Sequence, residues 1–209
     1  QTHRRGTEGS EDLDLKGPEW DVFTSPKPPT DYPHFMSKTV DVPKWFEKHI
    51  SRVLILERLR EVNALIGFTR VESPNEGSGA ERAHRAPIGR TTPNWVPATQ
   101  VHGEGIFLQF SEAALAEWAN RPGVWRQEAE LRRGHRGWRA RRGLEPDPDF
   151  PGIRFALLHT LAHMLIRELA LDCGYNAASI RERVYADAEA GKSQAGILIY
   201  TAAADSDGT

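Results

Sequence analysis

The chain has 209 residues, of which 39% are hydrophobic and 27% are charged, and its formal net charge is -2. This length suits one ordinary domain or two small ones, with enough apolar residues for one modest core. No apolar run approaches the ~18 residues of a membrane-spanning helix, and the first residues lack the hydrophobic core of a secretion signal. Because Cys173 is the single cysteine, the chain has no internal disulfide and no multi-cysteine zinc site. We therefore expect a cytoplasmic protein.

Arginine carries most of the positive charge. The sequence holds 21 arginines and 6 lysines, and Lys192 is the one lysine after Lys48. A guanidinium group is planar and offers a fork of donors that matches phosphate and carboxylate groups. A genome that favours arginine codons explains the same bias without any function, so the composition leaves both explanations open.

We predict that residues 1–49 form an extended, proline-rich arm or linker. They contain six prolines between Pro18 and Pro43 and few aliphatic residues, and proline disfavours both helix and central strand. Aromatic residues spread through the segment argue against simple disorder. We expect the arm to lay these side chains on another surface, of this chain or of a partner. They are Trp20, Phe23, Tyr32, Phe35, Trp45 and Phe46.

Residues 50–209 are predicted to form an α/β domain with a small mixed sheet. Segment 53–62 fits either a strand or a helix, because a short β-branched run overlaps apolar residues at helical spacing. Residues 105–110 fit a strand, and Ser111 can cap a helix over 112–120. Further expected elements are a strand over 68–72, a loop over 73–95, a basic helix-like stretch over 125–142, an extended connector over 145–151 and a central strand over 195–201.

The clearest predicted element is a helix over 153–172. Apolar residues surround it almost completely, and a helix with so small a polar face is normally buried. Gly174 suits the left-handed residue that ends many helices. We expect a second helix, capped by Asn176 or Ser179 and ending near residue 188, so that a C-terminal helical pair packs on the sheet.

His159 and His163 are four residues apart on the predicted helix, so both imidazole rings lie on one face. This is the spacing of two zinc ligands in a metalloprotease motif, where a glutamate general base follows the first histidine. Here Thr160 takes that position, and no cysteine pair adds further ligands. We therefore predict structural histidines, with ring nitrogens bonded within the protein or to a partner, and no metal ligand.

Residues 121–143 form a second group of chemical interest, with eight arginines against two glutamates. Arginines neutralise phosphates, and the interleaved tryptophans can stack on unpaired bases. A basic surface that faces solvent or an acidic subunit explains the charge as well. Gly134 and Gly137 weaken a helix, so a loop that becomes ordered on binding is a further interpretation. The candidate nucleic-acid-binding residues are Arg132, Arg133, Arg136, Arg139, Arg141, Arg142, Trp125 and Trp138.

An acidic loop of small residues, 202–209, follows the strand expected over 195–201. The carboxyl end of a strand is a common place for a functional site. No spacing marks a Ser–His–Asp triad, however, and there is no glycine-rich phosphate loop with lysine. We therefore assign no catalytic residue. An enzyme, metal-dependent or hydrolytic and centred on His159, His163 and the Asp205–Asp207 loop, is the alternative hypothesis.

Three stretches of the sequence resemble one known family. They are FALLHTLAH at 155–163, RELALDCGYNAASIRERVY at 167–185 and AGILIYTAAADSDGT at 195–209. Shorter matches are LREV at 59–62, GFTR at 67–70 and GEGIFLQF at 103–110, and together the matches cover most of residues 53–209. The family is a helicase-associated domain closest to the DrmB component of DISARM anti-phage systems.

The resemblance implies a protein without catalytic activity of its own, which partners a superfamily 2 helicase of the DrmA type and binds DNA with it. It gives no role to His159 or His163. The family pattern continues past Gly208-Thr209, and related helicases carry a cysteine-bound zinc there. The resemblance therefore implies that residues 50–209 are a helicase-associated domain truncated at its C-terminus, with no cofactor in this chain and with zinc possible beyond it. DNA and a helicase subunit are the expected partners, and a membrane is not.

Overall fold

The computed structural model describes residues 15–27, 33–68, 86–90, 94–146, 150–188 and 193–201. Its strands are β1 (Phe35–Val40), β2 (Ile50–Ala64), β3 (Ala98–Phe110), β4 (Ile180–Tyr185) and β5 (Gly196–Thr201). They form one sheet in the order β1-β2-β3-β5-β4. Each pair of neighbours is antiparallel. The prediction of a mixed sheet is therefore wrong. The sequence indicates which strands are buried but not the direction in which the chain re-enters the sheet.

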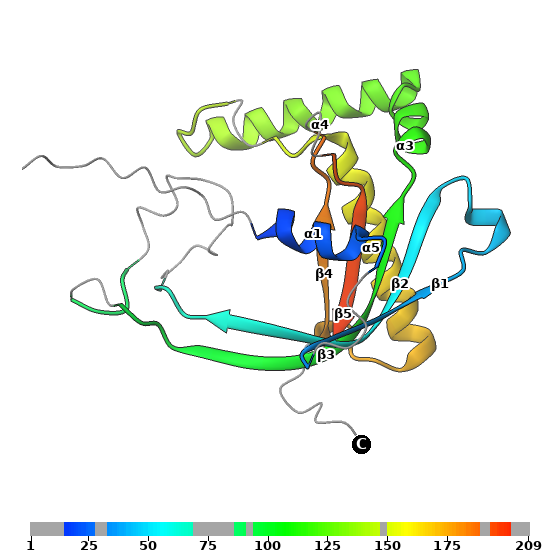
Figure 1. Cartoon of the computed structure of the whole chain (residues 1–209). Helices are drawn as coiled ribbons and strands as arrows, with labels where there is room; N and C mark the ends of the chain where they lie inside the picture. Colours follow the sequence, from blue (N-terminus) through cyan, green and yellow to red (C-terminus); the bar gives the residue numbers. More distant parts are fainter. Residues whose placement is uncertain are drawn as a thin grey trace, which may run out of the picture.

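The helices among the described residues are α1 (Lys16–Thr24), α3 (Glu112–Ala119), α4 (Pro122–Ala140) and α5 (Gly152–Cys173), with short 3-10 helices η1 (Lys44–Phe46) and η2 (Ala177–Ser179). Helix α5 lies against one face of the sheet and α1 against the other, while α4 lies across one end of the sheet beside α3 (Figure 1). The α/β class is therefore confirmed. None of these helices is long and apolar enough to cross a membrane.

One side of the core lies between α5 and the strands β4 and β5. Leu158 and Ala162 of α5 are fully buried among residues of both strands, including Ile197 and Val184. Other residues of α5 are not covered, because Met164 and Leu171 are 60% and 68% exposed. The helix that was expected to be buried is therefore covered on one face only. This face packs as expected, with Leu161 and Leu165 against the core, and Gly174 ends the helix with φ +73°.

The other side of the core lies under α1. Phe23 of this helix stacks on Phe107 of β3 with ring centroids 4.8 Å apart, and Trp20 packs against Tyr185. The aromatic residues of the N-terminal segment thus do find a surface, and for Trp20 and Phe23 it is the sheet of this same chain. Helix was not expected here, but Pro18 lies in the first turn of α1, where proline costs little because that N–H has no helical partner.

The N-terminal segment also contributes a strand to the sheet, which was not expected of an extended arm. Residues 35–40 form strand β1, which pairs with β2 at one edge of the sheet. Trp45 and Phe46 of η1 remain exposed. Tyr32 lies outside the described residues.

Residues 53–62, for which the sequence fits either a strand or a helix, belong to strand β2. It is one long strand paired with β3, and in Figure 1 the two strands run on together beyond the rest of the sheet. Val62 lies in this projecting part and is 56% exposed. The helical spacing of the apolar residues around it therefore does not correspond to a buried helix face. The expected strand 68–72 lies outside the described residues after Phe68, as does most of the expected loop 73–95.

The predicted second helix near residues 179–188 is wrong, because residues 180–185 are strand β4. Asn176 Oδ1 accepts a hydrogen bond from the backbone N–H of Ala178, but it caps a single 3-10 turn. The sequence IRERVY alternates with period two, which places Ile180 and Val184 toward α5. The C-terminal helical pair is therefore α4 and α5, which contact each other.

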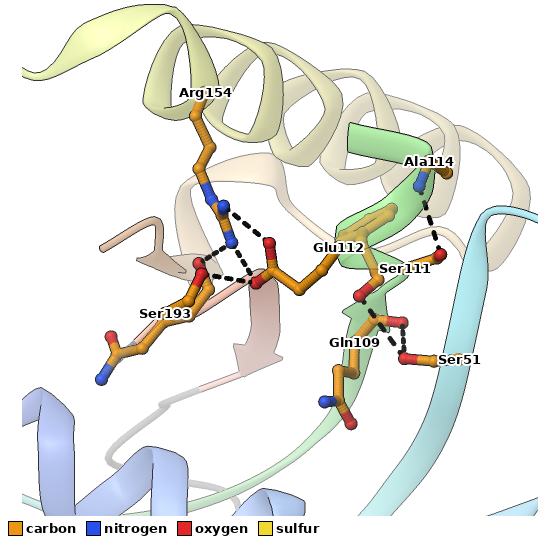
Figure 2. Close-up of polar contacts among 9 residues, drawn as sticks. Ser51, Gln109, Ser111, Glu112, Ala114, Arg154 and Ser193 are labelled. Carbon is orange, nitrogen blue, oxygen red and sulfur yellow. Dashed lines mark hydrogen bonds and ion pairs between the residues drawn. The ribbon is translucent and has the colours of Figure 1, made fainter. Parts of the chain in front are cut away.

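A polar network fixes the start of α5 against α3 and β5. The Arg154 guanidinium binds both oxygens of Glu112, in the first turn of α3, and also donates to the carbonyl of Gln194 (Figure 2). Ser193 donates a 2.9 Å hydrogen bond to the same carboxylate. As predicted, Ser111 caps α3 by accepting a hydrogen bond from Ala114 N. This network sets the position from which α5 crosses β4.

Candidate functional site

Helix α5 and strand β4 bring two imidazoles and one carboxylate together. His159 Nε2 lies 2.9 Å from Glu182 Oε1 and 3.0 Å from His163 Nε2, and His163 Nε2 lies 3.5 Å from the same carboxylate oxygen. Among the residues that the structure describes, this is the one group of three or more metal-binding side chains with converging ligand atoms. We call these three residues the His–His–Glu cluster.

The cluster is partly shielded from water. The side chain of Glu182 is 20% exposed, whereas those of His159 and His163 are 42% and 62% exposed. The ring of Phe155 stacks on His159 with centroids 5.2 Å apart, which holds that imidazole over β4. Glu182 Oε2 is buried and has no hydrogen-bond partner within the described part of the chain. A carboxylate is thus held with one oxygen shared between two rings and the other unsatisfied.

Thr160 is not oriented to assist chemistry at this cluster. Its hydroxyl donates a 2.7 Å hydrogen bond back to the carbonyl of Ala156, one turn earlier in α5. The residue that follows the first histidine is therefore neither a general base nor a ligand.

Sequence reasoning missed Glu182 because the segment around it was expected to be helical. Once residues 180–185 are a strand, their alternation puts Glu182 on the same face as Ile180 and Val184, which pack against α5. If the segment had been predicted as a strand, Glu182 would have stood out as a charged residue between two core residues, Ile180 and Val184. The Asp205–Asp207 loop of the alternative hypothesis lies outside the described residues.

The basic stretch 121–143 is helical over most of its length, despite Gly134 and Gly137. Pro122 stands at the start of α4, where proline is favoured. Arg133, Arg141 and Arg142 of the predicted set are exposed, as is Arg136, which also has an intramolecular contact.

Two of the six predicted arginines are structural. Arg139 is 6% exposed, and its Nε donates a hydrogen bond to the carbonyl of Glu145, which closes the end of α4. Arg132 pairs with Glu128 at 3.2 Å and lies 4.4 Å above the ring of Phe150. Burial removes Arg139 from the set that can reach a phosphate, and the ion pair of Arg132 with Glu128 competes with such a role.

The two tryptophans of the predicted set differ. Trp125 is 58% exposed on the first turns of α4. Trp138 is half-buried, with the guanidinium of Arg142 lying 4.1 Å from its ring centroid and the ring of His135 stacked nearby. Trp125 is therefore the better placed of the two to stack on an unpaired base.

Comparison with known proteins finds two similarities to this chain. Residues 161–209, which include His163 and Glu182, match the family of the MrfA Zn-binding domain. A relative that matches nearly the whole chain is the DISARM protein DrmB of Bacillus paralicheniformis (strain ATCC 9945a / NCIMB 11709 / CD-2). It is 31% identical over 196 residues, which cover 93% of this chain. The resemblance to the DrmB component of DISARM systems is therefore confirmed. The chain spans about a third (34%) of the length of that relative.

The family name raises the question of whether these residues suit zinc. A four-cysteine site does not fit this chain, because Cys173 is its single cysteine. The His–His–Glu cluster does fit, because imidazole nitrogens and a carboxylate oxygen are ordinary zinc ligands and three of them converge here. Its buried, unsatisfied carboxylate oxygen also suits a neighbouring cation.

Proposed function

We propose that this chain is part of a subunit of a DISARM anti-phage system, and that it binds DNA through helix α4 in a complex with a helicase subunit. The single observation that carries the subunit assignment is the match to DrmB over 93% of the chain. DNA binding is supported by the arginines that α4 presents to solvent. The helicase partner is supported by the family resemblance. In this proposal the ATP-driven helicase activity belongs to that partner and not to this chain.

The exposed arginines of α4 share one side of the helix. Arg126, Arg133 and Arg136 follow a spacing of seven and then three residues, which brings them to one side of an α-helix. All three side chains are exposed, so this side of α4 reaches solvent although the helix also contacts α3 and α5. A helix of 19 residues is about 28 Å long, enough to follow several phosphates of one strand.

The C-terminal end of α4 extends the basic surface. Arg141 and Arg142 follow the last helical residue and are exposed. Arg142 is pre-positioned by its stacking on Trp138, which lowers the entropy lost when it binds a phosphate. We call Arg126, Arg133, Arg136, Arg141 and Arg142 the α4 arginine surface.

Phosphate contacts predict a specific binding behaviour. They do not read sequence, so replacing Arg133, Arg136, Arg141 and Arg142 with glutamine should weaken binding to all DNA sequences alike. Each lost contact should flatten the slope of log K against log salt by about 0.9 on duplex DNA or about 0.7 on single strands. The measurement is fluorescence anisotropy at several salt concentrations, with the chain assembled with its helicase subunit.

The matched control replaces Arg90 and Arg167, which are exposed and lie outside α4, with glutamine. The control should keep both the affinity and the salt slope. If the α4 variant still assembles and binds DNA with unchanged affinity and slope, DNA binding by this surface is wrong. Loss of assembly with the helicase subunit would instead assign the surface to subunit pairing.

A further inference from the structure

We propose that the His–His–Glu cluster is a binding site for one transition-metal ion, zinc in the first place, which links helix α5 to the edge strand β4. The proposal is independent of DNA binding by α4. It departs from the prediction of purely structural histidines, because that prediction did not include Glu182. Three short contacts join His159, His163 and Glu182.

Hydrogen bonding alone satisfies this geometry poorly. An ionised Glu182 only accepts, and each Nε2 either carries a proton or offers one lone pair. If His159 Nε2 donates to Glu182 across 2.9 Å, it has no lone pair for His163 at 3.0 Å. If it accepts from His163 instead, its lone pair faces the carboxylate oxygen. With the glutamate ionised, either a single proton on His159 Nε2 is shared between both short contacts, or one of these contacts joins two groups of the same kind.

A single cation resolves the conflict, because it accepts lone pairs from all three atoms at once. Tetrahedral ligands at zinc bond lengths are separated by about 3.3 Å. The three separations in the cluster are 2.9, 3.0 and 3.5 Å, so small side-chain movements would bring the ligands to that spacing. The charge of the ion would also compensate the buried, unpartnered Glu182 Oε2.

The donor types select the class of metal. Imidazole suits zinc and neighbouring transition metals, whereas calcium and magnesium prefer oxygen ligands throughout. Two histidines and one glutamate leave a fourth tetrahedral position, which the exposure of His163 makes accessible to water or to a group of a partner. Thr160 stands where the metalloprotease motif has a glutamate general base, and its hydroxyl bonds back to its own helix.

The location gives the metal a structural consequence. Strand β4 is at the edge of the sheet, and the cluster attaches it to the middle of α5. An ion that binds the folded chain more tightly than the unfolded chain raises the free energy of unfolding. Zinc should therefore raise the melting temperature of this chain.

The experiment uses the 209-residue chain after treatment with a chelator and exchange into metal-free buffer. Zinc is then added and counted by mass spectrometry, and cobalt is added separately for its absorption spectrum. We expect one zinc per chain and a tetrahedral cobalt spectrum without the thiolate charge-transfer band of a cysteine site. A Cys173→Ser variant should leave both results unchanged.

The ligand variants are His163→Ala and Glu182→Gln, and each should weaken zinc binding at least tenfold and remove the rise in melting temperature. Glu182→Gln keeps the size of the side chain, and His163 is largely exposed, so both variants are expected to fold, as circular dichroism would show. The matched controls are His49→Ala and Glu117→Gln, which are exposed positions outside the cluster and should bind zinc as the parent does.

Two results would overturn the proposal. One is a folded parent chain that takes up no zinc or cobalt. The other is unchanged zinc binding in both folded ligand variants, which would place the ion elsewhere. In either case His159, His163 and Glu182 would form a hydrogen-bonded cluster whose strained contact relaxes in solution.

Discussion

The hydroxyl of Tyr185, on the edge strand β4, donates a 2.8 Å hydrogen bond to Glu19 of helix α1. Burial and the neighbouring charge of Glu19 raise the pKa of Tyr185 far above its ordinary value, so the hydroxyl stays protonated as a donor. Arg183 pairs with the same carboxylate at 2.6 Å. Residues 166 positions apart in the chain thus attach the N-terminal helix to the sheet.

Replacing Tyr185 with phenylalanine tests this attachment. The variant keeps the ring that packs against Phe23 and Phe107 and removes only the donor. We expect a loss of about 1 kcal/mol in the free energy of unfolding, together with faster hydrogen exchange in α1. Denaturant titration and exchange mass spectrometry measure the two effects.

A Tyr200→Phe variant serves as a comparison, since it removes a hydroxyl on the same face of the sheet that bonds to Glu61 rather than to α1. It should leave exchange in α1 unchanged. Equal exchange in α1 for the parent and Tyr185→Phe would show that this hydrogen bond does not help to hold the helix on the sheet.

The sequence predicts well the elements whose signals are local. Ser111 followed by Glu112 marks the start of α3, and Gly174 marks the end of α5, because capping geometry depends on residues within one turn. Residues 105–110 are a strand as predicted, since a short apolar run bounded by turn residues leaves few alternatives.

The sequence predicts poorly what distant contacts decide. Residues 16–24 become a helix because Phe23 and Trp20 have a sheet to pack against, and that sheet is built from strands far along the chain. The direction of β5 beside β3 is likewise a long-range property. The His–His–Glu cluster could be predicted only in part, since two ligands follow from helical spacing and the third depends on the pairing of β4 with α5.

The core on the α5 side gives a second prediction. Leu158 is fully buried, so Leu158→Ala should cost about 2–5 kcal/mol of unfolding free energy through lost contacts and a residual cavity. Met164 lies on the same helix but is largely exposed, so Met164→Ala should change stability by less than about 0.5 kcal/mol. Denaturant titration of both variants measures the contrast, and equal losses would contradict the packing of α5.

The network around Glu112 gives a dependence on pH. Burial raises the pKa of this carboxyl, but hydrogen bonds from Arg154 and Ser193 and the charge of Arg154 outweigh it and lower the pKa below its ordinary 4.5. A carboxyl whose pKa is lower in the folded state stabilises the protein above pH 4.5, and this stabilisation is lost as the pH falls below that value. The Glu112 side chain is 49% exposed, so solvent screening keeps the effect below about 1 kcal/mol.

Glu112→Gln should therefore be less stable than the parent at pH 7, and the difference should shrink as the pH is lowered from 5 toward 3. Denaturant titration across this range measures it. Glu117→Gln is the reference, because Glu117 is exposed and its ion pair with Lys48 is long at 3.6 Å. A difference between parent and Glu112→Gln that stays constant with pH would contradict the role of this carboxylate.

The last prediction separates structural from exposed arginines on α4. Arg139 is buried and closes the end of the helix on the carbonyl of Glu145, whereas Arg133 is exposed on the outer side. Arg139→Ala should lower the free energy of unfolding by about 1–3 kcal/mol, because it removes a buried side chain and the charged donor that it gives to the carbonyl of Glu145. Arg133→Ala should leave stability within about 0.5 kcal/mol of the parent and weaken DNA binding instead.

Thermal unfolding and DNA anisotropy on the same two variants measure both effects. If Arg139→Ala weakens DNA binding without loss of stability, while Arg133→Ala changes neither, then the helix turns the opposite face toward DNA and our assignment of the α4 arginine surface is wrong.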